Sequence, residues 1–362
     1  MSNTIDASPM MRAVRLQHSD RIPVWLMRQA GRYMQEYRNV RNKVTFIELC
    51  KTPSLAAEVM LTAVERLGVD AAIIFSDILL ILEPMGFGIT FPDEGGPRVT
   101  KPIRNPQDVK NIKELESENQ LHYVMDTVRY TREGLNNRMP LIGFAGAPFT
   151  LATYTIGETD NINSNQNSNQ NRKSTNNRNF QNVKAFMHLY QTEWSDLMHK
   201  FAVSTAKYLN GQIAAGAEII QIFDSWAGCL SVEDYAEFVQ PYSKLLIDLI
   251  LPGTPVIHFA PGNPMLLPNI AASGGNVIGV DWRIPIDKAW DIIGNNHAIQ
   301  GNLDPAILLT DRDTIRRNVQ KIIRLTKQKN GFIFNLGHGI LPQTPTENAI
   351  ALVEAVHEFG QK

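Results

Sequence analysis

The sequence predicts an α/β fold built as one (β/α)₈ barrel of the TIM type, with the active-site cleft at the carboxyl ends of the strands. Two observations predict it: short apolar runs recur along the chain, and segments with helix-start and helix-end signals separate them. The eight runs are 24–27, 71–75, 141–144, 218–223, 256–259, 277–280, 298–300 and 332–334. Continuous hydrophobicity is typical of parallel strands covered on both faces. Strands that alternate with helices this often favour a closed barrel over an open sheet.

Helix signals between the runs support this alternation. Thr52 and Pro53 predict an N-cap followed by proline at the first helical position, and the helix should end near Gly68. Residues 344–347, Thr-Pro-Thr-Glu, predict a capping box with proline at the first position of the last helix. Apolar residues at helical spacing follow, and Gly360 marks the expected end of that helix.

Length and composition are compatible with one unit of this kind. The chain has 362 residues, which is long for one domain, yet barrels commonly exceed ~250 residues as a single domain. Hydrophobic residues make up 43% and charged residues 20%, values typical of a globular protein with a sizeable core. We therefore expect a single domain over residues 1–362 and exclude a disordered or fibrous chain.

Charge and cysteine content exclude several partners. Lys and Arg total 35 against 36 Asp and Glu, so no net positive charge attracts nucleic acid or an anionic membrane. The two cysteines, Cys50 and Cys229, are too few for a disulfide scaffold and lack the C-x-x-C spacing of zinc sites. The most apolar stretch, 71–82, is shorter than the ~20 residues of a membrane span, and the first residues lack signal-peptide character. We expect a cytoplasmic protein.

Polar residues stand directly after most of the apolar runs. They are Arg28-Gln29, Ser76-Asp77, Asp224-Ser225, Asp281-Trp282-Arg283, Asn302-Leu303-Asp304 and His338. Barrel enzymes have their active sites at this face, so these residues predict one composite site. Several arginines beside a central carboxylate indicate an anionic ligand.

Three arginines follow the first run closely. Arg28 and Arg32 are four residues apart, and Arg41 comes nine residues later. Arginine binds carboxylates through paired, directional hydrogen bonds, so this group suits a substrate with several carboxylates. For any one of them a surface ion pair is the alternative.

Five sequence blocks carry a resemblance to a known family. The first is Met-Arg-Gln-Ala-Gly-Arg-Tyr-Met at 27–34, and the others are 74–79, 143–150, 300–305 and 334–340. Together they resemble the uroporphyrinogen decarboxylase family, in the same order, over residues 9–360. The resemblance implies that the acetate side chains of uroporphyrinogen III, four in number, lose CO₂ and become methyl groups, which gives coproporphyrinogen III in haem biosynthesis. It implies no metal and no organic cofactor.

The resemblance also implies roles for individual residues. Asp77 and Arg28 would be catalytic, and the substrate would be bound by Arg28, Gln29, Arg32, Arg41, Asp77, Tyr154, Ser225 and His338. Taken alone, Tyr154 could be a core tyrosine, Ser225 a cap or turn residue, and His338 a structural histidine.

The chemistry agrees with these assignments. A pyrrole protonated on a ring carbon accepts the electrons left when CO₂ departs, so the substrate does the work of a cofactor. A carboxylate such as Asp77 is expensive to bury without donors, which the pyrrole N–H groups could provide, and its charge would stabilise the cationic ring. A helix N-cap is the alternative role for Asp77. Because guanidinium groups are weak acids, Arg28 could either donate a proton or only position water and acetate.

One segment departs from the family pattern. From about 159 to 182 Asn, Gln and Ser dominate where the family has a short turn, which predicts an inserted surface loop. A tolerated insertion is favoured over a functional lid because loop length costs little free energy.

Two other functions stay open. A corrinoid-dependent methyltransferase of the same superfamily needs zinc held by histidine and cysteine, but His258 has no cysteine two residues on. A non-catalytic tetrapyrrole-binding protein could dispense with Asp77 or Arg28, and both are present. The resemblance further suggests a homodimer with its two barrel mouths facing each other.

Overall fold

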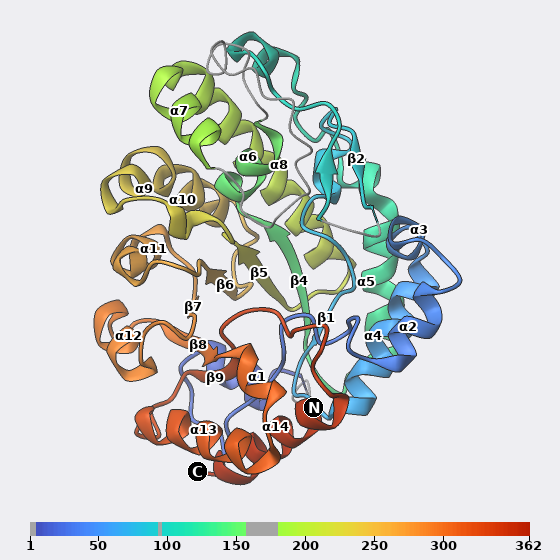
Figure 1. The fold of residues 1–362 in the computed structure, drawn as a ribbon, viewed down its shortest axis with the longest axis vertical. Coiled ribbons are helices and arrows are strands. Elements are labelled where there is room, and N and C mark those ends of the chain that lie inside the picture. Colours follow the sequence, from blue (N-terminus) through green and yellow to red (C-terminus); the bar gives the residue numbers. More distant parts are fainter. Residues whose placement is uncertain (1–4, 93–95, 157–179) are drawn as a thin grey trace.

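A curled, parallel β-sheet forms the centre of the molecule. The computed structural model describes residues 5–92, 96–156 and 180–362. Within these ranges the sheet has seven strands in the order β1-β4-β5-β6-β7-β8-β9, with helices outside it (Figure 1). The strands are β1 (Ala72–Ile73), β4 (Leu141–Gly146), β5 (Ile219–Phe223), β6 (Val256–Phe259), β7 (Val277–Gly279), β8 (Ala298–Leu303) and β9 (Phe332–Leu336). Seven of the eight predicted runs are thereby confirmed as strands, and the α/β class with them.

The eighth predicted strand, 24–27, is wrong as a strand. It is reduced to one parallel bridge between Val24 and Phe334 of β9. The reason is that backbone N–H groups of this segment donate to side chains instead of to a neighbouring strand. Val24 N–H donates to the Asp70 carboxylate at 2.9 Å, and Met27 N–H donates to the Asn335 side chain at 3.1 Å. In place of the predicted closed barrel of eight strands, the described residues form a curled sheet of seven strands, and the Val24 bridge adds one residue pair at the β9 edge.

A hydrogen-bonded chain across the inside of the sheet shows how strongly it curls. Trp25 Nε1 donates to Gln300 Oε1 at 2.9 Å, and Gln300 Nε2 donates to Gln221 Oε1 at 3.1 Å. Gln221 lies in β5 and Gln300 in β8, with β6 and β7 between them in the sheet. Direct contact between side chains of β5 and β8 requires both to project into the concave side. All three are buried.

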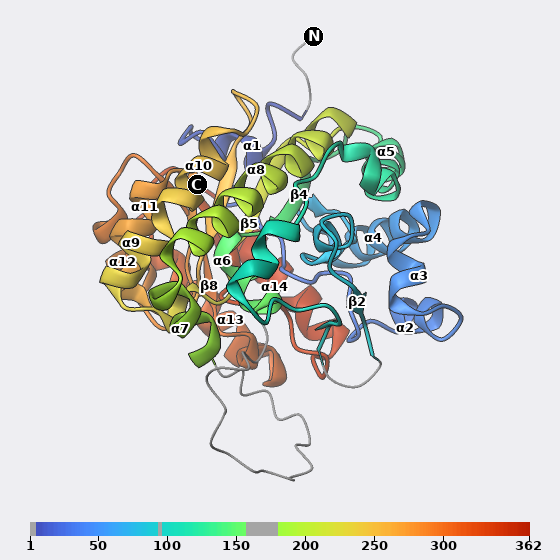
Figure 2. The same ribbon diagram turned by 90° about the horizontal axis from the view of Figure 1, so that it is seen from above.

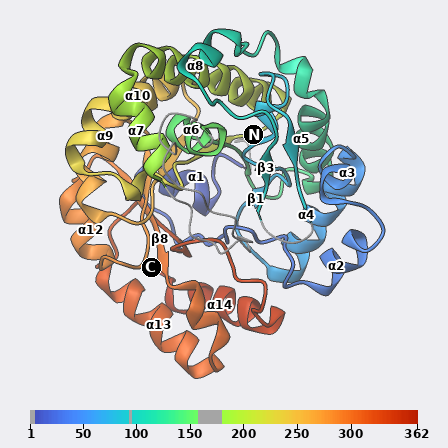
Figure 3. The same ribbon diagram turned by 45° about the horizontal axis from the view of Figure 1, so that its top comes forward.

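Helices surround this sheet. They are α1 (Pro9–Val14), α2 (Gln35–Arg41), α3 (Phe46–Cys50), α4 (Pro53–Leu67), α5 (His122–Leu135), α6 (Pro148–Thr155), α7 (Gln181–Leu189), α8 (Gln191–Ala215), α9 (Val232–Phe238), α10 (Gln240–Asp248), α11 (Leu267–Ser273), α12 (Ile286–Ile293), α13 (Arg312–Leu325) and α14 (Thr346–Phe359). Short 3₁₀ helices are η1 (Leu80–Leu82), η2 (Pro106–Asn111), η3 (Glu118–Leu121), η4 (Ala227–Cys229), η5 (Pro264–Leu266) and η6 (Pro305–Leu309). Helices α2 to α5 cover one flank and α9 to α12 the opposite flank (Figure 2). Helix α1 lies inside the ring of helices (Figure 3).

Of the four predicted helix boundaries, the start and end of α4 and the end of α14 are confirmed. Helix α4 begins at Pro53 and ends at Leu67, with Gly68 as its C-cap in a left-handed conformation (φ of 69°). Helix α14 ends before Gly360 as expected. The capping box at 344–347 is wrong, because Pro345 occupies the N-cap position and has no side-chain acceptor. The Thr346 hydroxyl instead donates to Tyr33 O at 3.3 Å.

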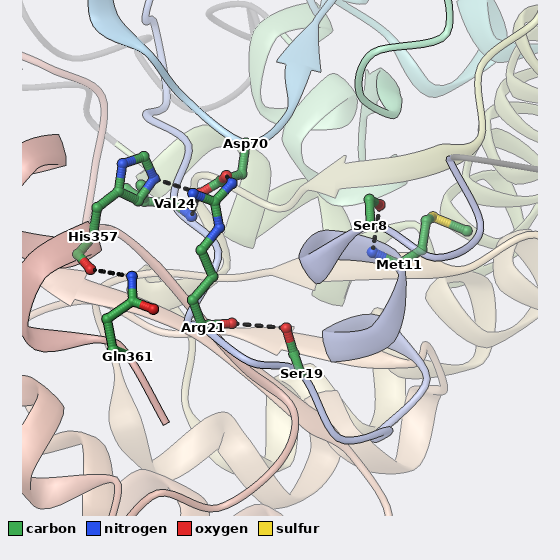
Figure 4. Close-up of polar contacts among 8 residues, drawn as sticks. All are labelled: Ser8, Met11, Ser19, Arg21, Val24, Asp70, His357 and Gln361. Atoms are coloured by element: carbon green, nitrogen blue, oxygen red, sulfur yellow. Dashed lines mark hydrogen bonds and ion pairs between the residues drawn. The ribbon is translucent and has the colours of Figure 1, made fainter.

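A clasp around Asp70 joins the start of the sheet to the last helix (Figure 4). Its buried carboxylate accepts hydrogen bonds from the Arg21 guanidinium and from Val24 N–H, and it contacts Nε2 of His357 at 2.9 Å. Asp70 N–H donates back to Val24 O at 2.8 Å. Because Asp70 directly precedes β1 and His357 lies on α14, one carboxylate connects three segments that are distant in the sequence.

Two further features complete the fold. A small antiparallel pair, β2 (Ile89–Thr90) with β3 (Arg98–Val99), was not predicted. The predicted Asn-rich loop at 159–182 lies outside the described residues except for its last three positions, where α7 already begins at Gln181. No helix within the described ranges has the length and apolar character to cross a membrane.

Candidate active site at the carboxyl edge of the sheet

Arg28 directly follows the bridged segment and has a left-handed backbone with φ of 64°. Its side chain lies against Gly339, in the loop after β9. A β-carbon on Gly339 would lie 2.6 Å from Cδ and 2.9 Å from Nε of Arg28. Any side chain at position 339 would therefore displace the guanidinium, so the glycine after His338 makes room for Arg28.

Asp77 follows β1 at the same edge and is partly exposed. Its Oδ1 accepts a hydrogen bond from Leu79 N–H at 2.9 Å. Burial raises the pKa of Asp77 to about 6, while the Leu79 N–H and the charge of Arg28 act in the opposite direction. The cap alternative is thus partly realised, since the carboxylate caps the turn before η1, and the same group lies within the electrostatic reach of Arg28.

His338 precedes Gly339, the glycine that Arg28 contacts, and it lies within reach of the Arg28 charge. It is exposed at the end of β9. Partial desolvation at this edge lowers the pKa of His338, as do the charges of Arg28 and Arg283, while Asp281 raises it. The structure therefore brings together Arg28, Asp77 and His338, three of the predicted site residues that come from distant parts of the chain.

Arg283 joins these residues, although the sequence predicted no role for it beyond its place after an apolar run. The Arg283 guanidinium forms an ion pair with buried Asp281 and lies over the Trp282 ring at 4.5 Å. A β-carbon on Gly337 would lie 2.7 Å from Trp282 N, so the loops after β7 and β9 touch. The signal that could have found Arg283 was its place after the run at 277–280.

Gln29, which was predicted to bind the substrate, lies in the interior of the protein. It is fully buried. Its Oε1 accepts from Leu26 N–H at 3.2 Å and its Nε2 donates to Ala71 O at 3.2 Å. Both ends of the amide are occupied inside the protein, so this placement favours holding the Arg28 segment against β1 over contact with a ligand.

The other two predicted arginines lie on the flank of α2. Arg32 is exposed just before that helix. The Arg41 guanidinium donates to Val44 O. Burial raises the pKa of Tyr37, while the nearby charges of Arg41 and Arg32 lower it, which places both cations near this tyrosine. Burial raises the pKa of Cys50, the charge of Asp77 adds to that rise and the charge of Arg41 opposes it, so Arg41 lies on the same side of the molecule as Asp77.

Tyr154 and Ser225 are held in one unit by contacts between α6 and the end of β5. The Tyr154 ring lies 6.3 Å from the Trp226 ring. Thr150, one helical turn before Tyr154, donates its hydroxyl to Asp224 Oδ1 at 3.1 Å. Burial raises the pKa of Asp224 to about 7, and the bond from Thr150 opposes that rise. Ser225, which follows Asp224, is partly exposed.

Residues that could hold a metal ion do not gather in the described part of the chain. No group of three or more His, Cys, Asp and Glu side chains is arranged for a metal there. His258 is fully buried, and burial lowers its pKa to about 4. It is in register with Ile222 and Ile278. This placement lends no support to a zinc site at His258.

Comparison with known proteins decides the family. The family model described as uroporphyrinogen decarboxylase matches residues 6–359. A uroporphyrinogen decarboxylase of Carboxydothermus hydrogenoformans is 46% identical over 351 residues, covering 97% of this chain and 96% of that protein. This chain belongs to the uroporphyrinogen decarboxylase family. A uroporphyrinogen decarboxylase of Geobacter metallireducens is also 46% identical, over 347 residues that cover 95% of this chain and 96% of the relative.

Solved structures share the fold of this uroporphyrinogen decarboxylase family member. A methyltransferase from Methanosarcina mazei superimposes with a TM-score of 0.80 at 21% identity, covering 97% of this chain and 98% of its own. A B12-independent methionine synthase from Shewanella sp. W3-18-1 gives a TM-score of 0.57 at 12% identity, with 87% and 91% covered. At these identities the similarity concerns the fold alone.

Proposed function

We propose that this chain is a carboxy-lyase that converts uroporphyrinogen III to coproporphyrinogen III by removing CO₂ from the acetate side chains. The observation that carries the proposal is the meeting of Asp77, Arg28 and His338 at the carboxyl edge of the sheet in a member of this family. A partly buried carboxylate near a guanidinium suits a reaction in which a positive charge forms on one part of an anionic substrate.

Each cycle exchanges a carboxylate for a proton. A proton adds to a pyrrole carbon, the bond between the acetate methylene and its carboxylate breaks, and the electron pair of that bond flows into the cationic ring. A second proton then adds to the methylene, and the ring loses the first one. The net reaction consumes one proton and releases one CO₂ for each acetate.

In this cycle Asp77 stabilises the cationic ring. Burial disfavours the charged form of Asp77, and hydrogen bonds from the pyrrole N–H groups would offset that cost. The attraction between the carboxylate and the ring would grow when the ring becomes positive. Arg28 holds the reacting acetate or a water molecule, because a guanidinium binds carboxylates far better than it donates protons.

The remaining predicted residues serve substrate binding in this proposal. Arg32 and Arg41 bind carboxylates at the flank of α2, and His338 binds one beside Arg28. Tyr154 and Ser225 contact the substrate from the unit that α6 forms with the end of β5. Gln29 contributes by holding the Arg28 segment, as its buried amide favours.

Closure of the barrel and assembly are part of the same proposal. The Val24 bridge to β9, with Asp70 N–H bonded to Val24 O, supports a single barrel unit closed at this position. The homodimer with facing mouths stays a prediction from the resemblance to the family. The unpaired cysteines fit a cytoplasmic, reducing location.

The test is anaerobic incubation of purified, metal-stripped protein with uroporphyrinogen III, followed by oxidation and chromatographic separation of the porphyrins. We expect stepwise loss of carboxylates down to the product that retains only the propionates. Unchanged substrate, with binding intact, would overturn the proposal in favour of a non-catalytic tetrapyrrole-binding protein. Activity that appears only with zinc and a corrinoid methyl donor would favour the methyltransferase.

A further inference from the structure

Arg283 occupies a position that the assigned site residues leave uncovered. Along the carboxyl edge, Asp77 follows β1, Arg28 follows the bridged segment and His338 follows β9. Arg283 comes after β7, on the side of His338 that is away from Asp77. It therefore adds a second guanidinium to this edge beyond that of Arg28, and its charge reaches His338.

The Arg283 side chain is held in place by its neighbours. Asp281, only 3% exposed, forms the ion pair with Arg283 and also accepts Arg283 N–H at 2.9 Å. A second loop fixes the carboxylate, because Gly262 N–H donates to Asp281 Oδ2 at 2.7 Å. The guanidinium also lies over the Trp282 ring at 4.5 Å. Such restraint lowers the entropy lost when a flexible arginine binds a ligand.

The same side chain keeps part of its guanidinium available. Its exposed fraction is 47%, and Asp281 is its one ion-pair partner among the residues that the structure describes. An arginine has five N–H donors, and one carboxylate accepts at most two of them in a bidentate pair. The remaining donors can bind another group. A fixed cation with spare donors at the edge of an active site is suited to bind a second carboxylate.

We propose that Arg283, together with His338, binds one peripheral carboxylate of the tetrapyrrole substrate. This inference rests on the proposed function, because it takes the multiply carboxylated macrocycle as the ligand. Arg283 is a binding residue in this account and takes no part in bond breaking. Asp281 is a positioning residue that orients Arg283.

The chain offers a matched control for the test. Arg316 on α13 also pairs with a carboxylate, that of Glu358, and lies over an aromatic ring, that of Phe359, at 4.9 Å. It lies away from the carboxyl edge. The variants Arg283→Gln and Arg316→Gln therefore remove the same kind of interaction at two places, and circular dichroism checks that both fold.

Two readouts are needed, one of them independent of turnover. Fluorescence titration with uroporphyrin, the stable oxidised octacarboxylate, measures binding, and steady-state kinetics with uroporphyrinogen give KM and kcat. For Arg283→Gln we expect Kd and KM to rise about tenfold, the loss typical of a charge-assisted hydrogen bond. We expect kcat to change less than about threefold, since a contact made equally before and during the reaction alters KM alone. Arg283→Lys should recover part of the affinity.

The outcomes separate this inference from the proposed function. If Arg283→Gln binds uroporphyrin as the unaltered protein does, or if Arg316→Gln loses affinity to the same extent, the inference is wrong. A fall in kcat with unchanged Kd would also overturn it. If the unaltered protein binds uroporphyrin through Arg283 but turns over no uroporphyrinogen, the proposed function fails and the inference stands. If the unaltered protein turns over uroporphyrinogen and Arg283→Gln does so with the same KM, the inference fails and the proposed function stands.

Discussion

Arg28 packs against Gly339 so closely that a β-carbon on the glycine would lie 2.6 Å from the arginine Cδ. The two residues are far apart in the sequence and meet because the segment after Val24 runs beside β9. Gly339 therefore determines where the guanidinium points. The glycines on either side of His338, Gly337 and Gly339, leave room for Trp282 and Arg28.

Gly339→Ala should move Arg28 and reduce kcat/KM by about tenfold or more, because a displaced arginine loses its alignment with the substrate. The backbone at 339 is not left-handed, so folding should be retained. Steady-state kinetics with uroporphyrinogen measure the effect. Gly134→Ala, whose new methyl group would press on Leu61 in the outer helices, is the control and should leave kcat/KM unchanged. Equal kinetics for the two variants would contradict the role given to Gly339.

Asp77→Asn should lower kcat by about 10²–10³-fold while the protein still folds, since the amide keeps the size of the side chain and removes the charge facing the cationic ring. The Asn oxygen can still accept the Leu79 N–H. Product chromatography after single-turnover incubation measures this loss. Near-normal turnover would show that the electrostatic account of Asp77 is wrong even if the protein is a decarboxylase.

The same variant should be more stable than the unaltered protein at alkaline pH. Burial raises the pKa of Asp77 to about 6 from 3.8, so the folded protein binds this proton more tightly than the unfolded chain does. Its contribution to the free energy of unfolding therefore falls as pH rises from about 4 to about 6, and the penalty is complete above that. Asn carries no such penalty. Urea unfolding at about pH 8 and about pH 4 should show a gain for Asp77→Asn that is larger at the higher pH. A destabilisation of equal size at both pH values would refute this.

Asp70→Ala should destabilise the fold by about 2–3 kcal/mol without lowering activity at moderate temperature. The buried carboxylate accepts from Arg21 and Val24 and contacts His357, so its loss leaves several donors unsatisfied. The site lies at the opposite edge of the sheet, and residues at that edge of a barrel serve stability. Thermal unfolding and kinetics measure the two effects. Asp20→Ala, which changes an exposed carboxylate, is the control. Loss of kcat below the unfolding range would contradict this separation.

The sequence alone determined seven strands of the central sheet and the edge at which the candidate site lies. Parallel strands covered on both faces must be apolar throughout, so the run 256–259 could be recognised locally and matches β6 residue for residue. The polar residues that follow such strands have to lie at one edge, because parallel strands share a direction. Asp77 and His338 were found in this way, and the resemblance of the residues around them to one family singled out Arg28.

Only the tertiary structure decided which neighbours in the sequence face the site and which face the core. Arg28 and Gln29 are adjacent, yet the first lies against Gly339 and the second is buried against β1. The strand predicted at 24–27 shortened to a bridge because Asp70 and Asn335 supply side-chain acceptors for its amides. Arg283 came within reach of His338 through the contact between the loops after β7 and β9. These outcomes depend on contacts between segments far apart in the chain, which local hydrophobicity and spacing do not encode.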